Sequence, residues 1–350
     1  MKEGYRFLGE YIRQVDIRNK EGKKENLLGV SVQKQFIQSI ANTVGTDFTK
    51  YKVVKKGQFT YIPDTSRRGD KIAIALLEDY EEGLVSNVYT VFEVIDTEKL
   101  LPEYLMLWFS RPEFDRYARF KSHGSVREVM DWEEMCKVEL PVPGIEKQRK
   151  IVKAYKTITD RIDLKQKIND NLESMLTAVY FEQFYSSKAS EYTKLSDLMV
   201  FGNGKSRPKT NGTIPVYGGN GVLSYTDKYN AENTVLIGRV GAYCGSVYLE
   251  QSICWVSDNA ILAKSKITND EFFDYFLLKG LNLFNHHVGT GQQLLTQDIL
   301  NNIEVPKPDI KQIGLFNMKA KSVFETISAN KCEIIRLQKL SDLLLARLAS

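Results

Sequence analysis

The chain has 350 residues, 43% of them hydrophobic and 11% aromatic, which is enough for two globular domains with separate cores. Lysine and arginine (48) nearly balance aspartate and glutamate (44), so the net charge of +4 is compatible with nucleic acid but excludes a block of basic charge. Four cysteines without CxxC spacing, a start without an apolar leader, and no apolar run of about 18 residues lead us to expect a soluble cytoplasmic protein.

The first globular part is expected to mix strands and helices. Runs rich in β-formers are separated by turn signals, and a helical stretch follows them. The strands are expected at Tyr51–Val54, Lys71–Leu76 and Val88–Val94, and the helical stretch at Pro102–Ala118. A Pro-x-Pro element, Pro141-Val142-Pro143, then precedes a long segment without proline.

This segment is expected to be one long helix, because no proline interrupts it. Its apolar residues recur with alternating spacings of four and three, which is the pattern of a heptad seam. The seam residues that carry this prediction are Ile151, Ile158, Ile162, Leu172 and Leu176.

The second globular part and its helix repeat this plan. Strands are expected at Thr234–Ile237 and Ser246–Leu249, and a helical stretch at Asp270–Phe284. A second Pro-x-Pro element, Pro306-Lys307-Pro308, precedes the second long helix. The seam residues of that helix are Val323, Ile327, Ile334, Leu337 and Leu344.

The two long helices are expected to pair with each other as a coiled coil. Polar Lys165, Asn169 and Asn330 interrupt the seams, and polar seam positions fix register and partner number. The alternative is that each helix packs on its own domain. About 35 residues at ~1.5 Å each make a rod on the order of 50 Å, which is long for packing on one small domain.

The chain contains an internal repeat. Pro141 and Pro143 recur as Pro306 and Pro308, 165 residues later, and the helix seams keep this offset without a gap. Within the globular parts the offset drifts, so that Leu8 corresponds to Leu195 only at 187 residues. Insertions and deletions therefore accumulate in the globular parts, while the helices keep their length.

Two variable globular parts, each joined to a constant helix through Pro-x-Pro, resemble the specificity subunit of type I restriction-modification systems over nearly the whole chain. The segment Ile237–Val247 followed by Ser257-Asp258-Asn259 is similar to a recurring segment of that family's target-recognition domains, and Gly202–Pro208 with Ile214–Gly221 to their opening loops. The first globular part resembles another variety of the same domain. An asymmetric, bipartite DNA target is therefore implied.

The resemblance implies an α+β fold with two target-recognition domains in a pseudo-two-fold arrangement, separated by two long antiparallel coiled-coil helices. The boundaries implied are 1–145 and 188–310 for the recognition domains, and 146–187 and 311–350 for the spacer helices. It also implies a non-catalytic subunit that binds double-stranded DNA, carries two methyltransferase (M) subunits and is joined by restriction/translocase (R) subunits. S-adenosylmethionine and ATP would bind elsewhere, so no cofactor is expected on this chain.

DNA contacts are expected from basic, amide and hydroxyl side chains in glycine-rich loops, since these groups reach phosphates and base edges. The alternatives, a solvated loop for the basic residues, turn chemistry for Asn220 and core packing for Tyr217 and Tyr243, stay open. The candidates of the second domain are Lys205, Ser206, Arg207, Lys209, Tyr217, Asn220, Arg239, Tyr243, Gln292 and Gln293. Those of the first domain are Ser31, Gln33, Lys34, Tyr61, Arg67, Arg68, Ser125 and Arg127.

Catalytic and metal chemistry is not expected. The string Gly202–Ser206 ends like a phosphate-binding loop, but the required first glycine falls at Met199. The three histidines, His123, His286 and His287, lack companions at metal-ligand spacing, so no metal site is expected. Two other hypotheses remain: an enzyme that forms its own cleaving or methylating site, and a coiled-coil adaptor for proteins rather than DNA.

Overall fold

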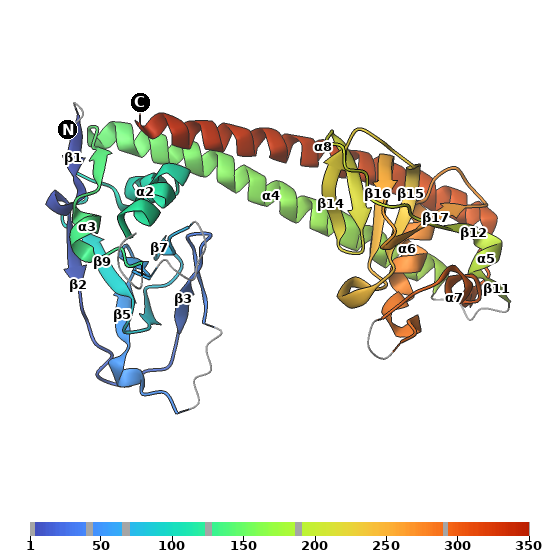
Figure 1. Ribbon diagram of the computed structural model, residues 1–350, viewed down its shortest axis with the longest axis horizontal. Coiled ribbons are helices and arrows are strands. Elements are labelled where there is room, and N and C mark those ends of the chain that lie inside the picture. Colours follow the sequence, from blue (N-terminus) through green and yellow to red (C-terminus); the bar gives the residue numbers. More distant parts are fainter. Residues whose placement is uncertain are drawn as a thin grey trace. The chain divides into compact units, whose positions relative to one another are not determined.

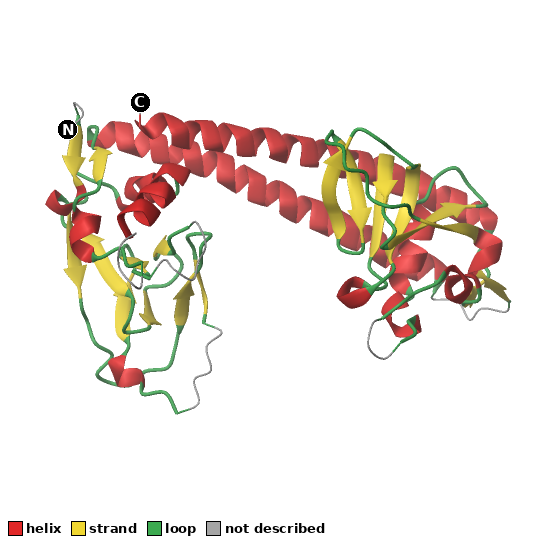
Figure 2. Ribbon diagram, viewed as in Figure 1, coloured by secondary structure: helices red, strands yellow, loops and turns green. Residues whose placement is uncertain are grey.

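The computed structural model describes residues 4–39, 45–64, 71–122, 128–185, 191–289 and 293–349. The chain forms two compact units: unit 1 comprises Met1–Leu164 and Ile334–Ser350, and unit 2 comprises Lys165–Glu333. Two long helices, α4 (Ile145–Phe184) and α8 (Ile310–Ala346), each contribute a section to both units (Figures 1 and 2). Among the described residues no helix is long and apolar enough to cross a membrane.

Unit 1 is built around a four-stranded antiparallel sheet in the order β2-β9-β6-β7. Its strands are β2 (Ile12–Val15), β9 (Thr90–Val94), β6 (Phe59–Tyr61) and β7 (Ile74–Leu76). Three two-stranded ladders accompany it: β1 (Tyr5–Phe7) with β10 (Glu139–Pro141), β3 (Leu28–Val30) with β4 (Phe36–Gln38), and β5 (Lys52–Lys55) with β8 (Glu82–Val85). Phe59 stacks on Phe92 at 4.9 Å between ring centroids and meets Phe109 of α1 edge-on, so the helix packs on the sheet through aromatic contacts.

The helices of unit 1 differ from the expected single stretch at Pro102–Ala118. The structure has α1 (Pro102–Phe109), α2 (Pro112–Ser122) and α3 (Trp132–Cys136) instead. Pro112 explains the break, because proline removes a helix donor and disfavours helical geometry in the residue before it, which is Arg111. The break leaves Arg111 between the two helices, buried against Trp108.

Unit 2 contains a six-stranded sheet in the order β12-β17-β15-β16-β13-β14, antiparallel except for the β13–β16 pair. Its strands are β12 (Met199–Asn203), β17 (Ala260–Ser265), β15 (Ala231–Gly238), β16 (Val247–Val256), β13 (Ile214–Gly218) and β14 (Gly221–Thr226). A two-stranded ladder joins β11 (Tyr192–Lys194) to β18 (Glu304–Pro306), and the short helices are α5 (Leu195–Leu198), α6 (Phe272–Gly280) and α7 (Gln297–Asn301). Buried aromatic rings of α4, α6 and α8 meet in its core, including Tyr180, Phe276 and Phe316.

Short 3₁₀ turns complete the chain: η1 (Leu8–Glu10), η2 (Phe48–Lys50), η3 (Gly241–Tyr243), η4 (Leu283–His286) and η5 (Arg347–Ala349).

The internal repeat is visible in the structure of each unit. The order β2-β9-β6-β7 in unit 1 corresponds to β12-β17-β15-β16 in unit 2, and β1 pairs with β10 as β11 pairs with β18. Asp131 caps α3 by accepting from the third backbone N–H of that helix, and Thr296, 165 residues later, caps α7 in the same way. The two units therefore share one frame. The β3–β4 hairpin and the β5–β8 ladder are particular to unit 1, and β13–β14 to unit 2.

The predicted seam residues of both helices are buried or half-buried. In unit 1, Ile158 and Ile162 of α4 cluster with Ile334 of α8. In unit 2, Lys165 Nζ donates to Asn330 Oδ1 at 2.8 Å, and the amide of Asn330 donates to Asn169 at 2.8 Å. Rising numbers on α4 meet falling numbers on α8, so the helices are antiparallel and the heptad pairing is confirmed.

The boundaries drawn between recognition domains and spacer helices stay predictions. The helices begin at Ile145 and Ile310, again 165 residues apart. The compact units do not separate at these points, because each unit contains a section of both helices.

Candidate nucleic-acid interface

Loops from different parts of the sequence meet on one surface of unit 2. The loop after β12 is joined to the end of β16, where the backbone N–H of Lys205 donates to the carbonyl of Val256 at 2.9 Å. The next residue, Ser257, donates its N–H to the carbonyl of Tyr217, next to the β13–β14 turn, also at 2.9 Å. These bonds hold the β12–β13, β13–β14 and β16–β17 connections together.

The β15–β16 connection and the segment before α7 join the same surface. Arg239 donates its backbone N–H to Asn259 at 3.0 Å and accepts from Leu295 at 2.9 Å. Gly241 donates to the carbonyl of Gln293 at 3.0 Å. Five connections are thus linked by backbone hydrogen bonds, and their side chains are held in fixed relative positions.

Two glycines make this close packing possible. A Cβ atom on Gly204 would lie 1.9 Å from the carbonyl oxygen of Ser257, and one on Gly238 would lie 2.1 Å from that of Tyr243. Real Cβ atoms do not approach backbone oxygens so closely, so a side chain at either position would separate the loops.

The surface presents hydrogen-bond donors and positive charge. Among the described residues of unit 2, no acidic side chain forms an ion pair with the cations of the β12–β13 loop. The predicted contact residues that are exposed here are Lys205, Ser206, Arg207, Lys209, Asn220 and Tyr243. Unpaired cations beside exposed amide and phenol groups can bind phosphates and base edges.

Two polar atoms within this surface have no hydrogen-bond partner. They are Nε of Arg239, whose side chain is half-buried, and Oγ of the buried Ser257. A buried donor without an acceptor costs about 1–3 kcal/mol, so such atoms are typical of positions that a ligand or water satisfies. Arg239 lies between the Asn259 and Leu295 segments, in the middle of the linked loops.

Two side chains beneath the loops are structural. Tyr217 is buried and donates its hydroxyl to Glu250 at 2.9 Å, so the prediction that it contacts DNA is wrong; burial and the Glu250 carboxylate raise the pKa of this phenol. The thiol of Cys244 is buried and points to the carbonyl of Arg239 at 3.4 Å, and burial raises its pKa. A protonated, buried thiol is a poor nucleophile.

In unit 1 the β3–β4 hairpin carries three predicted contacts, of which one is wrong. Lys34 is buried: its ammonium lies 2.8 Å from the Asp115 carboxylate and donates to the carbonyl of Phe109, and burial lowers its pKa. The side chain therefore anchors the hairpin on α2. Gln33 is exposed at the tip, and Ser31 donates its hydroxyl to the carbonyl of Gln35 at 3.2 Å.

Tyr61 is also removed from the candidates, because its side chain is fully buried beside Phe92 in the core of unit 1. The position falls in β6, where the inward alternation of the strand decides its direction. Five further predicted contacts lie outside the described residues: Arg67, Arg68, Ser125, Arg127 and Gln292.

Unit 1 repeats the loop connections of unit 2. Asp64, after β6, forms a bridge with Val129, and Val240, after β15, forms the equivalent bridge with Leu294. The turn before β9 occupies the place of the turn before β17, and each carries an exposed asparagine, Asn87 or Asn259. Sequence reasoning did not select these two residues as contacts. The signal was present in the repeat, which aligns Ser86–Tyr89 with Asp258–Ile261.

Comparison with known proteins agrees with this geometry. Residues 9–174 and 188–341 match the family described as "Type I restriction modification DNA specificity domain". The type I restriction enzyme MjaIX specificity subunit from Methanocaldococcus jannaschii is 23% identical over 308 residues, which cover 73% of this chain and 70% of that protein. The HindI specificity subunit from Haemophilus influenzae is 26% identical over 135 residues, 38% of this chain and 29% of that protein.

The fold is also that of a solved structure. The crystal structure of the S subunit of a type I restriction-modification system from M. genitalium covers 99% of this chain and 96% of its own, with a TM-score of 0.64 and 15% identity. At this identity the likeness concerns the fold alone, whereas the two family matches cover nearly all of the sequence. The chain therefore belongs to the type I restriction-modification DNA specificity family and carries two copies of its domain.

Proposed function

We propose that this DNA specificity subunit reads two different short sequences, one with each recognition domain, and that it carries two methyltransferase subunits on its helices. Subunits of this family recognise DNA and leave methylation and cleavage to the methyltransferase and restriction subunits of the complex. The observation that carries the proposal is the pair of matching loop connections on one shared frame, Asp64–Val129 and Val240–Leu294. Because the loops on this frame differ in sequence, the two half-sites should differ as well.

Arg239 is the side chain we expect to read a base in the second half-site. It is fixed through its backbone at the centre of the loops, and its guanidinium has a donor without an acceptor. Arginine discriminates guanine by a bidentate bond to O6 and N7, worth about 1–3 kcal/mol against the wrong base. Lys205, Arg207 and Lys209 are expected to hold phosphates instead.

Methylome sequencing tests the reading of DNA. Cells that express this chain with its methyltransferase should carry N6-methyladenine at one asymmetric, interrupted motif, and cells without the chain should not. Arg239→Lys should relax one base position of one half-site and leave the other half-site unchanged. An unchanged methylome after deletion of the chain, with the methyltransferase bound, would instead favour a protein adaptor.

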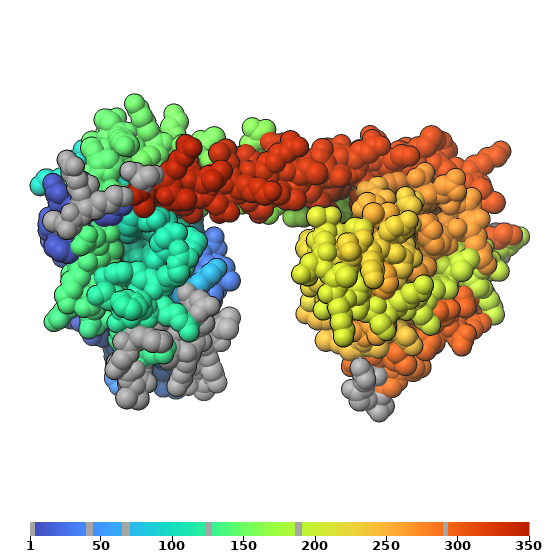
Figure 3. Space-filling view, turned by 45° about the horizontal axis from the view of Figure 1, so that its top comes forward, coloured from blue at the N-terminus to red at the C-terminus, as the bar shows by residue number. Residues whose placement is uncertain are grey.

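The outward faces of the helices are where we expect the methyltransferase subunits. Figure 3 shows side chains of α8 (red) that no other element covers in that view. Met175 of α4 and Leu340 of α8 are equivalent in the repeat and are 49% and 50% exposed. Leu164 and Ile168 on α4 and Leu343 on α8 are exposed as well. Apolar groups exposed at repeated positions are typical of protein docking surfaces, and a repeat offers two of them.

Light scattering on the assembled complex tests this stoichiometry. The unmodified chain should bind two methyltransferase subunits, and either Met175→Lys or Leu340→Lys should reduce this to one. Ser174→Lys and Gln338→Lys are matched controls, because they place the same charge on exposed neighbouring positions of the same helices. Loss of neither subunit in both apolar-to-lysine variants would show that docking occurs elsewhere.

A further inference from the structure

A cavity in unit 1 lies away from the loops described above. It has a volume of about 600 Å³ and is enclosed by β1, β10, α2 and the end of α1. Its walls are largely aromatic, with Phe7, Trp108, Phe114 and Tyr117. Phe7 leaves 41% of its surface exposed, and on α2 the strongly exposed Phe120 stands directly before Lys121, which also lines the cavity. The cavity can therefore accept a large apolar side chain.

A buried arginine forms one side of this cavity. The guanidinium of Arg111 lies 4.2 Å from the ring centre of Trp108, and its Nη2 is 3.3 Å from a carboxylate oxygen of Glu113. Glu113 is shared with Arg116, at 3.1 Å. The Nε of Arg111 is buried and has no hydrogen-bond partner, although the residue is almost fully buried. A buried cation with a free donor favours an anionic acceptor.

Unit 2 has no equivalent cavity at this place. The residues that correspond in the repeat to Phe7 and Lys137 are Lys194 and Asn302, and they are hydrogen-bonded to each other at 2.9 Å. In unit 2, α6 is followed by the short η4, and α2 has no helical counterpart among the residues described there. An occupant of the cavity would therefore bind once per chain, unlike subunits that dock on repeated positions.

We propose that this cavity binds a segment of a partner protein in which an aromatic side chain stands next to a carboxylate. The aromatic ring enters between Phe7, Trp108 and Tyr117, and the carboxylate accepts from Arg111. DNA is not the expected occupant, because Glu113 and Glu139 line the cavity and would repel phosphates. The exposed apolar rim, which continues to Phe120, favours a protein partner.

Fluorine NMR on the full chain labelled with 5-fluorotryptophan tests the proposal directly. The chain has three tryptophans, of which Trp108 lines the cavity while Trp132 and Trp255 serve as internal references. The probe is acetyl-Phe-Glu-amide, with acetyl-Phe-Gln-amide as its uncharged analogue. We expect the first peptide to shift the Trp108 signal alone and to saturate it, and the second to bind roughly tenfold more weakly.

Two variants provide the controls. Phe7→Ser should weaken binding of acetyl-Phe-Glu-amide at least about fivefold, whereas Ile37→Ser, at a strand position of unit 1 that is 44% exposed and outside the cavity, should not change it. Equal affinity for the two peptides, or no shift of Trp108, would overturn the proposal. This measurement on the unmodified chain does not depend on any variant folding, nor on DNA being read.

Discussion

The basic loop after β12 is the residue-scale feature that most directly separates DNA binding from simple solvation. Lys205, Arg207 and Lys209 are exposed, and a lysine or arginine that neutralises a phosphate releases a counterion. Replacing all three by alanine should reduce the slope of log K against log salt by about 0.9 for each phosphate that is no longer neutralised, or ~2.7 for all three. Fluorescence anisotropy with target duplex between low and moderate salt measures this slope.

The control for that experiment removes the same charge elsewhere. Alanine at Lys311, Lys319 and Lys331, which are exposed on α8, should leave the slope nearly unchanged. An equal effect of the two triple variants would show that net charge, and not direct binding of phosphates by the loop, governs affinity.

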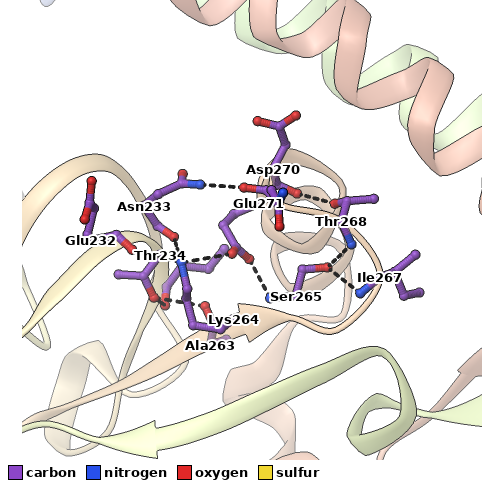
Figure 4. A network of polar contacts seen from close by, with 12 residues as sticks. Glu232, Asn233, Thr234, Ala263, Lys264, Ser265, Ile267, Thr268, Asp270 and Glu271 are labelled. Carbon is purple, nitrogen blue, oxygen red and sulfur yellow. Dashed lines mark hydrogen bonds and ion pairs between the residues drawn. The ribbon is translucent and has the colours of Figure 1, made fainter.

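Asp274 is a buried acid whose ionisation opposes folding. It is 1% exposed, and neither carboxyl oxygen has a hydrogen-bond partner. Burial raises its pKa well above the ordinary value, and the charge of Glu271 raises it further. Figure 4 shows how Glu271 itself is held, by Lys264 at 3.3 Å and by the N–H of Ser265 at 2.8 Å. The folded chain therefore keeps a proton on Asp274 that the unfolded chain releases.

The sign of the pH dependence follows from this difference. Above the ordinary aspartate pKa near 4, the unfolded state binds fewer protons than the folded state, so this residue lowers stability as pH rises toward its folded-state pKa. Asp274→Asn should gain on the unmodified chain by about 1.4 kcal/mol per pH unit in that window. Urea unfolding at pH 5 and pH 8 measures the gain, and Asp258→Asn, at an exposed position, is the control. A gain that is the same at both pH values would contradict the assignment.

At the scale of elements, a buried amide joins each long helix to its globular part. Gln148 of α4 accepts from the N–H of Leu101, at the start of α1, at 2.9 Å, and donates to two carbonyls. Asn317 of α8 accepts from the N–H of Phe273, at the start of α6, at 2.8 Å, and also donates twice. Both side chains are buried, so each fixes a helix start to the helix that carries the domain.

Gln148→Met keeps the approximate volume but removes three hydrogen bonds. It should destabilise unit 1 by about 2–4 kcal/mol, because buried backbone groups lose their partners. Lys147→Met, at the exposed neighbouring position, should cost less than about 0.5 kcal/mol. Thermal unfolding compares the two variants. Equal small losses would mean that water replaces the amide.

The sequence predicts elements where the pattern is local and misses what depends on tertiary contact. The proline-free, heptad-spaced segments after Pro143 and Pro308 predict α4 and α8, because a seam constrains many residues at once. The strands β5, β9 and β15 follow from short apolar runs. By contrast, Lys34 is polar in a polar hairpin, and only its contact with Asp115 buries it. The amides of Gln148 and Asn317 carry no local signal at all, since their partners lie about 45 residues away in the sequence.

For the candidate site, composition locates the loops but not the direction of each side chain. Lys205, Arg207 and Asn220 are exposed as expected, while Tyr61 and Tyr217 are buried. Tyrosine fits both a core and a DNA surface, so the sequence alone leaves its place undecided. Strand register decides between the two, and register depends on pairing with distant strands.

At the scale of the whole molecule, the polar interruption of the helix pair selects which helices pair. Lys165 and Asn330 are equivalent in the repeat and face each other, and Lys165 also lies 2.8 Å from Glu333. In an antiparallel pair, equivalent residues meet, so pairing α4 with α4 of a second copy would bring two Lys165 ammonium groups together. That repulsion disfavours pairing between copies, and such a pair would also lack the hydrogen bond to Asn330 and the ion pair with Glu333.

Replacing both residues by leucine tests this selection. Lys165→Leu with Asn330→Leu should raise the thermal midpoint, because apolar seam residues pack without the cost of burying a charge. The same variant should form concentration-dependent dimers in light scattering, because either helix can then pair with a second copy. Lys167→Leu removes one charge from an exposed position of α4 and should change neither property. A double variant that stays monomeric at every concentration would show that the apolar seams alone determine the pairing, through residues such as Ile158, Ile162 and Ile334.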